Sequence, residues 1–249
     1  YYEGWGFESG LLFFIASGVM LISTIPMFFV PEGGIGKKGI SSKTGNASIS
    51  KQLLMFLLAM LFINFGINSV ALMKSQYLAL DEGFDVSSGL LSYIVNTGSF
   101  AIFVVGLLVR RISDRFRDEM MLLIGTMTAI LYLTGFAVAS NLPMIFVSNF
   151  LYGASNAIIV ASSYSFASRL IQPERRGRYF AFFNATLFLS WGLPGTFIVG
   201  PIVDQLITSG STQAFAYRTS FVTAAILTFS GALILVLVIR MNKHGRKAS

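Results

Sequence analysis

Seven long apolar runs, each of about 20 residues or more, limit most strongly how this 249-residue chain can fold. In a bilayer every backbone amide has to bond within the protein, so a spanning segment is either an apolar helix or a strand of a closed barrel. The runs show no polar–apolar alternation, which favours helices. They cover residues 10–30, 52–80, 88–109, 120–139, 143–168, 179–203 and 219–239. The sequence therefore predicts an all-α membrane protein, a helical bundle of about seven transmembrane helices.

Residue usage agrees with this class, because 54% of the residues are hydrophobic and only 12% are charged. Cysteine is absent and His244 is the one histidine, so we expect neither disulfides nor a zinc or histidine-based enzyme. We expect no metal, no cofactor and no catalytic residue. The first residue is Tyr1 and no signal-peptide pattern precedes the first run, so we expect a truncated or processed chain.

The basic residues alternate from connector to connector. All but Lys74 and Arg218 of the 18 lysines and arginines lie in every second connector or in the carboxyl-terminal tail. Positive residues are retained on the cytoplasmic side, so the amino terminus is predicted outside and the carboxyl terminus inside the cell. The net charge of +7 then belongs beside anionic lipid, and no nucleic acid partner is expected.

The longest connector, residues 31–51, is rich in Gly, Ser and Lys and is predicted to be a flexible cytoplasmic linker. It separates a leading transmembrane helix at 1–30 from a six-helix domain at 52–240. A basic cytoplasmic tail follows at 241–249.

Asparagines mark the second, third, fifth and sixth runs and are absent from the others: Asn64, Asn68, Asn96, Asn149, Asn156 and Asn184. Side chains three or four residues apart share a helix face, so these amides form polar stripes with nearby serines. Such stripes either line a common polar cavity or hold helices together, at about 0.6–2 kcal/mol per contact. We favour a cavity, because bundle contacts have no reason to avoid the fourth and seventh runs. The polar, polar, apolar order occurs twice, which predicts a 3+3 inverted repeat with substrate near the midplane.

Three motifs in this block are similar to those of the major facilitator superfamily. The first is a cytoplasmic loop signature, degenerate here because Arg110 and Arg117 stand where the family often has glycine: Asp114-Arg115-Phe116-Arg117. The second is similar to the loop that enters the eleventh family helix: Pro173-Glu174-Arg175-Arg176-Gly177-Arg178-Tyr179. The third is similar to the glycine and proline pattern of the fifth family helix and its eleventh-helix counterpart: Gly192-Leu193-Pro194-Gly195-Thr196, then Gly200-Pro201.

The resemblance covers essentially the whole chain, as the sixth helix, the central loop and the carboxyl-terminal half of a twelve-helix transporter. It implies a secondary active transporter that moves a small organic solute by alternating access. The implied partners are the small-molecule substrate, the lipid bilayer and the amino-terminal half of the same transporter. It also implies a multi-pass protein of a plasma membrane, which we expect to be the prokaryotic inner membrane.

The stripes and the resemblance together assign candidate site residues. The predicted substrate cavity contains Asn64, Asn68, Lys74, Asn96, Tyr152, Asn156, Asn184 and Trp191. The predicted cytoplasmic gate contains Asp114, Arg115, Arg175, Arg176 and Arg178, with Asp114 pairing with one of the last three arginines or remaining solvated. Helix packing and bending are assigned to Gly192, Pro194, Gly195, Gly200 and Pro201.

Lys74 is the one cation inside a predicted span. Either it extends to the outer interface, or it faces the cavity and pairs with an anionic substrate group or a carboxylate of the other half. No Asp or Glu lies at mid-depth in 52–240, so a proton-coupling carboxylate is predicted to lie in the other half.

Two other functional classes stay open at this stage. A seven-span receptor is one, because Asp114-Arg115-Phe116 follows the third run, although the cysteine bridge and a last-run Asn-Pro pair are absent. A transporter-like sensor or assembly protein that moves no solute is the other. An uptake assay discriminates both from a carrier.

Overall fold

A computed structural model describes residues 14, 15, 18, 19, 22, 49–113, 115–171 and 176–245. The chain divides into two compact units, 1–47 and 48–249. In the first unit the five described residues are helical. Most of the predicted leading helix, nearly all of the linker and the end of the basic tail therefore lie outside the described residues, and the predicted domain boundaries stay predictions.

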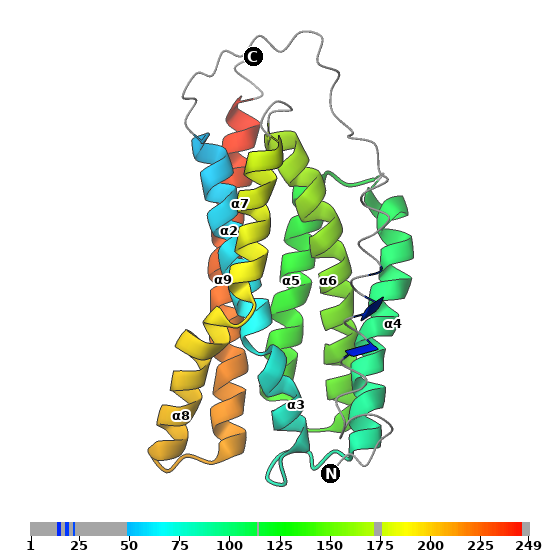
Figure 1. Ribbon diagram of the computed structural model, residues 1–249, viewed down its shortest axis with the longest axis vertical. Helices are drawn as coiled ribbons and strands as arrows, with labels where there is room; N and C mark the ends of the chain where they lie inside the picture. The colour runs from blue at the N-terminus through cyan, green and yellow to red at the C-terminus, as the bar shows by residue number, and fades with distance from the viewer. Residues whose placement is uncertain are drawn as a thin grey trace. The chain divides into compact units, whose positions relative to one another are not determined.

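The second unit is built from helices throughout its described part, and this confirms the predicted all-α fold class (Figure 1). In chain order they are α2 (Lys51–Ser69), α3 (Ala71–Ala79), α4 (Ser88–Ser113), α5 (Asp118–Val138), α6 (Leu142–Leu170), α7 (Arg176–Ser190), η3 (Gly195–Val199), α8 (Gly200–Thr208) and α9 (Gln213–Gly245). Six stretches of the described chain are long and apolar enough to cross a membrane, and they coincide with the second to seventh predicted runs.

Capping side chains and a glycine turn define several helix ends. Ser50 caps α2, where its side chain accepts a hydrogen bond from the Leu53 amide at 3.2 Å. Asn141 caps α6 in the same way through the Met144 amide at 3.0 Å, and Pro143 occupies the first turn. Gly210 takes a positive φ of 88° in the turn between α8 and α9, a conformation that glycine adopts without strain.

The helices pack in the spatial order α4, α6, α5, α9, α2, α7, so that α4 and α7 lie at the two ends of the series. Glycines allow the closest crossings. A β-carbon added to Gly153 of α6 would lie 2.0 Å from the Gly98 carbonyl oxygen of α4. One added to Gly66 of α2 would lie 2.0 Å from the Thr228 hydroxyl oxygen of α9. At both crossings only glycine lets the two backbones approach this closely.

The second and sixth predicted runs, at 52–80 and 179–203, are not continuous helices. The first is interrupted at Val70, whose backbone (φ −102°, ψ 6°) separates α2 from α3. The second is interrupted after Ser190, where Gly192 has a positive φ of 97° and Pro194 precedes the π-helical segment η3. Apolar length predicted both spans, but it carries no information about interruptions within them.

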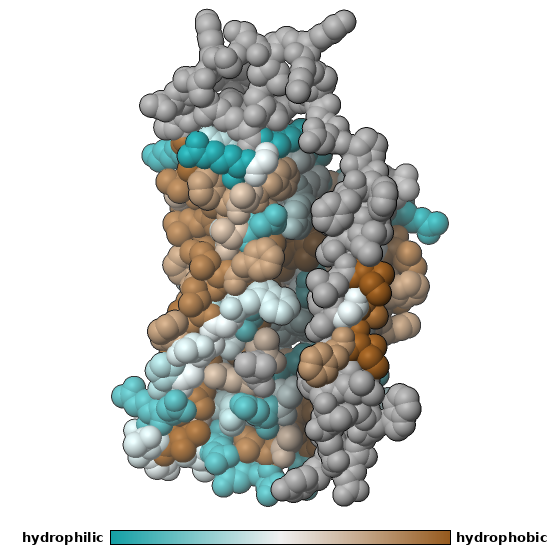
Figure 2. All heavy atoms as spheres, in the orientation of Figure 1, coloured by the Kyte–Doolittle hydropathy of each residue, from teal (hydrophilic) through white to brown (hydrophobic). Residues whose placement is uncertain are grey.

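The outward faces of α5 and α9 are apolar, as predicted for the spans without asparagine. Their exposed large side chains recur every three, four or seven residues, which keeps them on one face: Met120, Ile124, Met127, Leu131 and Val138 on α5, and Val222, Ile226, Phe229, Leu233 and Leu237 on α9. In Figure 2, polar side chains gather at the two ends of the visible face and apolar ones lie between them. This is the distribution expected of a bundle that crosses a membrane.

Candidate substrate site and gate

Lys74 of α3 is turned into the bundle, toward α6. Its Nζ donates a hydrogen bond of 2.8 Å to Asn149 Oδ1. The same ammonium lies 4.2 Å from the ring centroid of Tyr152 and 6.0 Å from that of Phe136 on α5. One charged group thus contacts an amide and two aromatic rings from two other helices, and it is turned toward the interior of the bundle.

The amide of Asn149, which accepts the hydrogen bond from Lys74, is itself held in place by α4. Its side chain is fully buried, and its Nδ2 donates to the Ile94 carbonyl oxygen of α4. The amide therefore bridges α3 and α4 through α6, with its oxygen oriented toward the lysine. Because Oδ1 is an acceptor and Nδ2 a donor, the two contacts together determine the orientation of the amide.

The ammonium of Lys74 forms no ion pair within the described part of the chain, whose ion pairs include that of Arg117 with Glu119 and that of Arg169 with Asp118. Lys74 is half-buried. An amide dipole and an aromatic face stabilise a cation, but neither neutralises its charge. The site therefore retains a net positive charge.

Two predicted cavity residues lie close to the interruption of α2. The Asn68 Nδ2 donates 2.7 Å to Ser190 Oγ, at the end of α7. Asn64, one turn earlier, is 5% exposed and its Nδ2 has no hydrogen-bond partner among the described residues. A buried amide hydrogen without an acceptor costs about 1–3 kcal/mol, so Asn64 is an unsatisfied polar group inside the bundle.

Other candidates lie on or beside the α6–α7 face. Tyr164 of α6 donates its hydroxyl to Asn184 Oδ1 of α7 at 2.7 Å. Asn156 is half-buried one turn after Tyr152 on α6. The ring of Tyr152 packs edge to face against Tyr132 of α5, with centroids 5.3 Å apart.

Two predicted cavity residues are not brought into these clusters. Asn96 is exposed on α4, together with Ser92 and Ser99 of its predicted stripe. Trp191 lies in the turn after α7 and is 77% exposed. The helix ends at Ser190, so the helical spacing that relates Trp191 to Asn184 does not continue past that residue.

The predicted bending residues lie at the second interruption. Gly192 has the positive φ, Pro194 precedes η3, and Pro201 lies in the first turn of α8. A β-carbon added to Gly195 would lie 3.4 Å from the Ser69 carbonyl oxygen, and the Gly200 amide donates to the Gly195 carbonyl. These contacts place the interruption of α7–α8 directly beside that of α2–α3.

The predicted gate is only partly visible. Asp114 and Arg175 lie outside the described residues, so their pairing stays a prediction. Arg115 and Arg176 are exposed. Arg178 is also exposed, and its guanidinium lies 5.9 Å from the centroid of the Phe182 ring.

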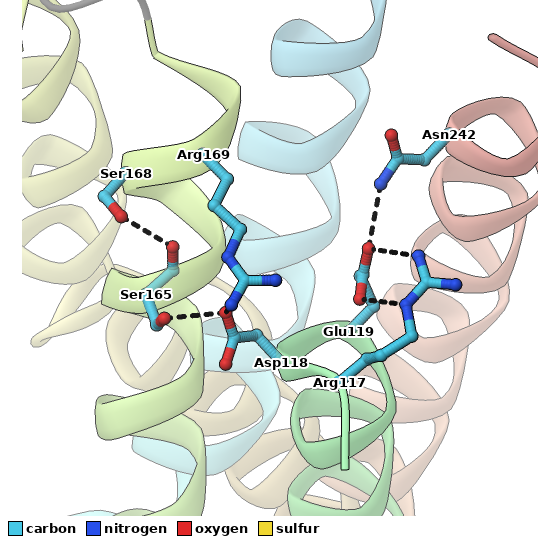
Figure 3. Close-up of polar contacts among 7 residues, drawn as sticks. All are labelled: Arg117, Asp118, Glu119, Ser165, Ser168, Arg169 and Asn242. Carbon is cyan, nitrogen blue, oxygen red and sulfur yellow. Dashed lines mark hydrogen bonds and ion pairs between the residues drawn. The ribbon is translucent and has the colours of Figure 1, made fainter. Parts of the chain in front are cut away.

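A different polar network, which the sequence analysis missed, lies at the same end of the bundle (Figure 3). Asp118 is 6% exposed and its Oδ2 accepts from Arg169 at 2.8 Å and from the Ser165 hydroxyl at 2.7 Å. Glu119 is 1% exposed and accepts from Arg117 at 2.9 Å and from Asn242 at 2.8 Å. The two carboxylates thus join the start of α5 to the ends of α6 and α9.

The signal for this network is the pair of acidic residues directly after Arg117. The amino terminus of a helix stabilises carboxylates, and both acids lie in the first turn of α5. The predicted span begins at residue 120, so both acids lie in the predicted connector before it. A small cavity of about 80 Å³ lies beside Asp118, between α4, α5 and α6.

The model of the Major Facilitator Superfamily matches residues 2–195 and, in a second alignment, residues 54–249. Together the two alignments span nearly the whole chain. No curated protein matches the sequence significantly. The topology, the apolar faces of α5 and α9 and this match agree, and the chain belongs to the Major Facilitator Superfamily of membrane transporters.

Proposed function

We propose that this protein is a secondary active transporter that moves a small organic solute by alternating access. The observation that carries the proposal is the polar cluster of Lys74, Asn149 and Tyr152 inside the bundle, close in sequence to the interruption of α2–α3. Charged groups inside a membrane bundle are rare and mark substrate or ion pathways.

The paired interruptions support the same proposal. Transporter sites form where helices are discontinuous, because the freed backbone groups and the bend both serve the site. Here Asn68 bonds to Ser190 at 2.7 Å, so the two interruptions lie together. A solute bound near them would contact the parts of the bundle that are least restrained by continuous helix hydrogen bonds.

The exposed polar side chains of α4 support a second six-helix unit, which we propose to be the amino-terminal half of the same transporter. Asn96 and Ser99 are exposed on α4, whereas the outward faces of α5 and α9 are apolar. An amide facing acyl chains is costly, and one facing a water-filled path or a polar partner is not. The solute pathway would then run between the two units.

Charge supports the proposed orientation. Within the described part of the second unit, the connectors at the Asp118 end carry the arginines, and the opposite end carries Asp81, Glu82, Asp85 and Asp204 with Arg218. The positive-inside rule puts the arginine-rich end in the cytoplasm. On this assignment the Asp118 and Glu119 network stiffens the cytoplasmic end of the unit while the two units rock.

The experiment uses the natural absence of cysteine, since single cysteines can be introduced without removing any others. Asn96→Cys, Asn156→Cys and Asn184→Cys should react with a membrane-impermeant thiol reagent in intact membranes. Leu131→Cys and Leu233→Cys, on the apolar faces of α5 and α9, are the matched controls and should not react. If none of the five cysteines reacted with the reagent, the asparagine positions would not be accessible to water, and the carrier proposal would fail.

Counterflow in liposomes that contain the purified protein measures transport itself. A radiolabelled solute should accumulate only when unlabelled solute is trapped inside and the protein is present. Water-accessible asparagine positions without flux of any solute would instead indicate a transporter-like sensor.

A further inference from the structure

The described part of the six-helix unit holds a cation without a counter-ion inside its membrane span. Lys74 Nζ is held by Asn149 Oδ1 at 2.8 Å and by the Tyr152 ring at 4.2 Å, and no described carboxylate forms an ion pair with it. The acids of the described chain lie in the connectors, at the start of α5 and on α8. The ammonium is half-buried, so it remains partly accessible.

Asn149 and Tyr152 contact the Lys74 ammonium but do not neutralise its charge. An ammonium has three donors, and Asn149 accepts one of them. The amide is also committed on its other side, to the Ile94 carbonyl, and cannot move without breaking that bond. A negatively charged oxygen arriving at the lysine would form charge-assisted hydrogen bonds with the remaining donors while Asn149 stays in place.

We propose that the transported solute is an organic anion whose carboxylate binds Lys74, and this inference rests on the proposed transport function. A group of one negative charge is favoured, since Lys74 is the one cation that the described chain places against Asn149 and Tyr152. A doubly charged phosphate ester would leave one charge uncompensated in a medium of low dielectric constant.

The surroundings of the ammonium define the rest of the solute. The half-buried ring of Tyr152 lies beside it and is backed by buried aromatic rings, those of Phe136 near the ammonium and of Tyr132, whose centroid is 5.3 Å from that of Tyr152. Aromatic faces bind apolar or ring-containing groups and leave the polar end to the charge. The ligand class is therefore a monocarboxylate with an apolar or aromatic body.

A rival occupant is a fixed carboxylate from the second six-helix unit. In that case Lys74 would be a structural cation, and its removal would destabilise the unliganded protein and weaken every ligand alike. An anionic solute predicts a selective effect instead, which falls on carboxylates and spares neutral ligands of the same shape. The two occupants therefore differ in a measurable way.

Thermal unfolding of the purified full chain tests this with matched pairs of probes: benzoate with benzamide, cyclohexanecarboxylate with its amide, and phenyl phosphate as the doubly charged member. The proteins are the parent, Lys74→Met, Lys74→Arg and the control Lys51→Met. Lys51 is an exposed lysine at the start of α2. Lys74→Met keeps the length of the side chain, and Lys74→Arg keeps its charge.

At least one carboxylate is expected to raise the midpoint of unfolding of the parent, while its amide does not. Lys74→Met should bind that carboxylate at least about 30-fold more weakly, Lys74→Arg should retain part of the affinity, and Lys51→Met should match the parent. Equal carboxylate affinity in the parent and Lys74→Met overturns the inference. So does a panel in which no carboxylate shifts the midpoint, or one in which Lys74→Met lowers the unliganded midpoint and weakens amides and acids together.

Counterflow of the same carboxylate separates this inference from the proposed function. Binding that depends on Lys74 without flux upholds the anion site and contradicts transport. Flux of a neutral solute that is unchanged in Lys74→Met upholds transport and overturns the anion site.

Discussion

The Asn68 amide of α2 donates a 2.7 Å hydrogen bond to the Ser190 hydroxyl at the end of α7, and this bond joins the two interruptions of the bundle. Ser190 in turn donates to the Leu187 carbonyl of its own helix. The space beside the Ser69 carbonyl is kept open by Gly195. The two interruptions are therefore linked by a direct side-chain contact.

Breaking this bond should destabilise the unit in a non-additive way. Asn68→Ala and Ser190→Ala are each expected to lower the free energy of unfolding in detergent by about 0.6–2 kcal/mol. The double variant should be little worse than either single variant, since the shared bond is already lost. Thr134→Val, on the exposed face of α5, is the control and should change stability by less than about 0.5 kcal/mol. Fully additive losses would show that the two side chains act independently.

The α4–α6 crossing should not tolerate a single methyl group. Gly153→Ala would place a β-carbon 2.0 Å from the Gly98 carbonyl oxygen, so the two helices would have to separate. We expect a loss of about 1–3 kcal/mol in unfolding free energy. Gly106→Ala on α4, where nothing lies within 4 Å, should be neutral or slightly stabilising because alanine favours helix. Equal stabilities of the two variants in a thermal melt would contradict the close crossing.

The Asp118–Arg169 pair should respond asymmetrically to mutation. The side chain of Arg169 is 51% exposed, whereas that of Asp118 is 9% exposed. Removing the arginine therefore leaves a buried carboxylate without its counter-ion, whereas removing the acid leaves an arginine that water can solvate. Arg169→Gln should therefore be more destabilising than Asp118→Asn. The helix terminus reduces this difference, because it stabilises the acid by about 0.3–1 kcal/mol.

A second variant makes the test of this pair sharper. Asp118→Asn combined with Arg169→Gln should be more stable than Arg169→Gln alone, since no buried charge remains. Chemical unfolding of the four proteins measures all the differences. A double variant that is less stable than both single variants would exclude a stranded carboxylate as the cause.

The ring of Tyr152 should matter more than its hydroxyl. No hydrogen bond of the hydroxyl is found in the described chain, whereas the ring contacts Lys74 at 4.2 Å and Tyr132 at 5.3 Å. Tyr152→Phe should therefore leave stability nearly unchanged. Tyr152→Leu should lower the unfolding free energy by about 1–3 kcal/mol, as both ring contacts are lost. Thermal melts of the two variants decide this, and a larger loss for Tyr152→Phe would assign the role to the hydroxyl.

Several features could be predicted from the sequence because they depend on local pattern. Apolar length predicted six spans that the structure describes. The absence of asparagine predicted that α5 and α9 present apolar faces. The glycine and proline cluster at 192–201 indicated bending, and the interruption of α7–α8 begins there.

Other features depend on which side chains meet across helices. That Lys74 is turned toward Asn149 and not toward an interface follows from the α3–α6 contact. The interruption at Val70 carries no glycine or proline signal, and the partners of Asp118 and Glu119 come from α6 and α9, dozens of residues away in the chain.

The sequence by itself determined that this protein spans a lipid bilayer. It also determined the number and approximate limits of the described spans and which helices carry polar side chains. These follow from the free energy of placing each side chain in lipid or water, which depends on local composition. Only the tertiary structure decided which polar groups share a site and that two interrupted helices lie side by side. Those relationships arise from contacts such as Lys74 with Asn149, Asn68 with Ser190 and Gly195 with the Ser69 carbonyl, and such a contact is a property of two distant segments that neither encodes alone.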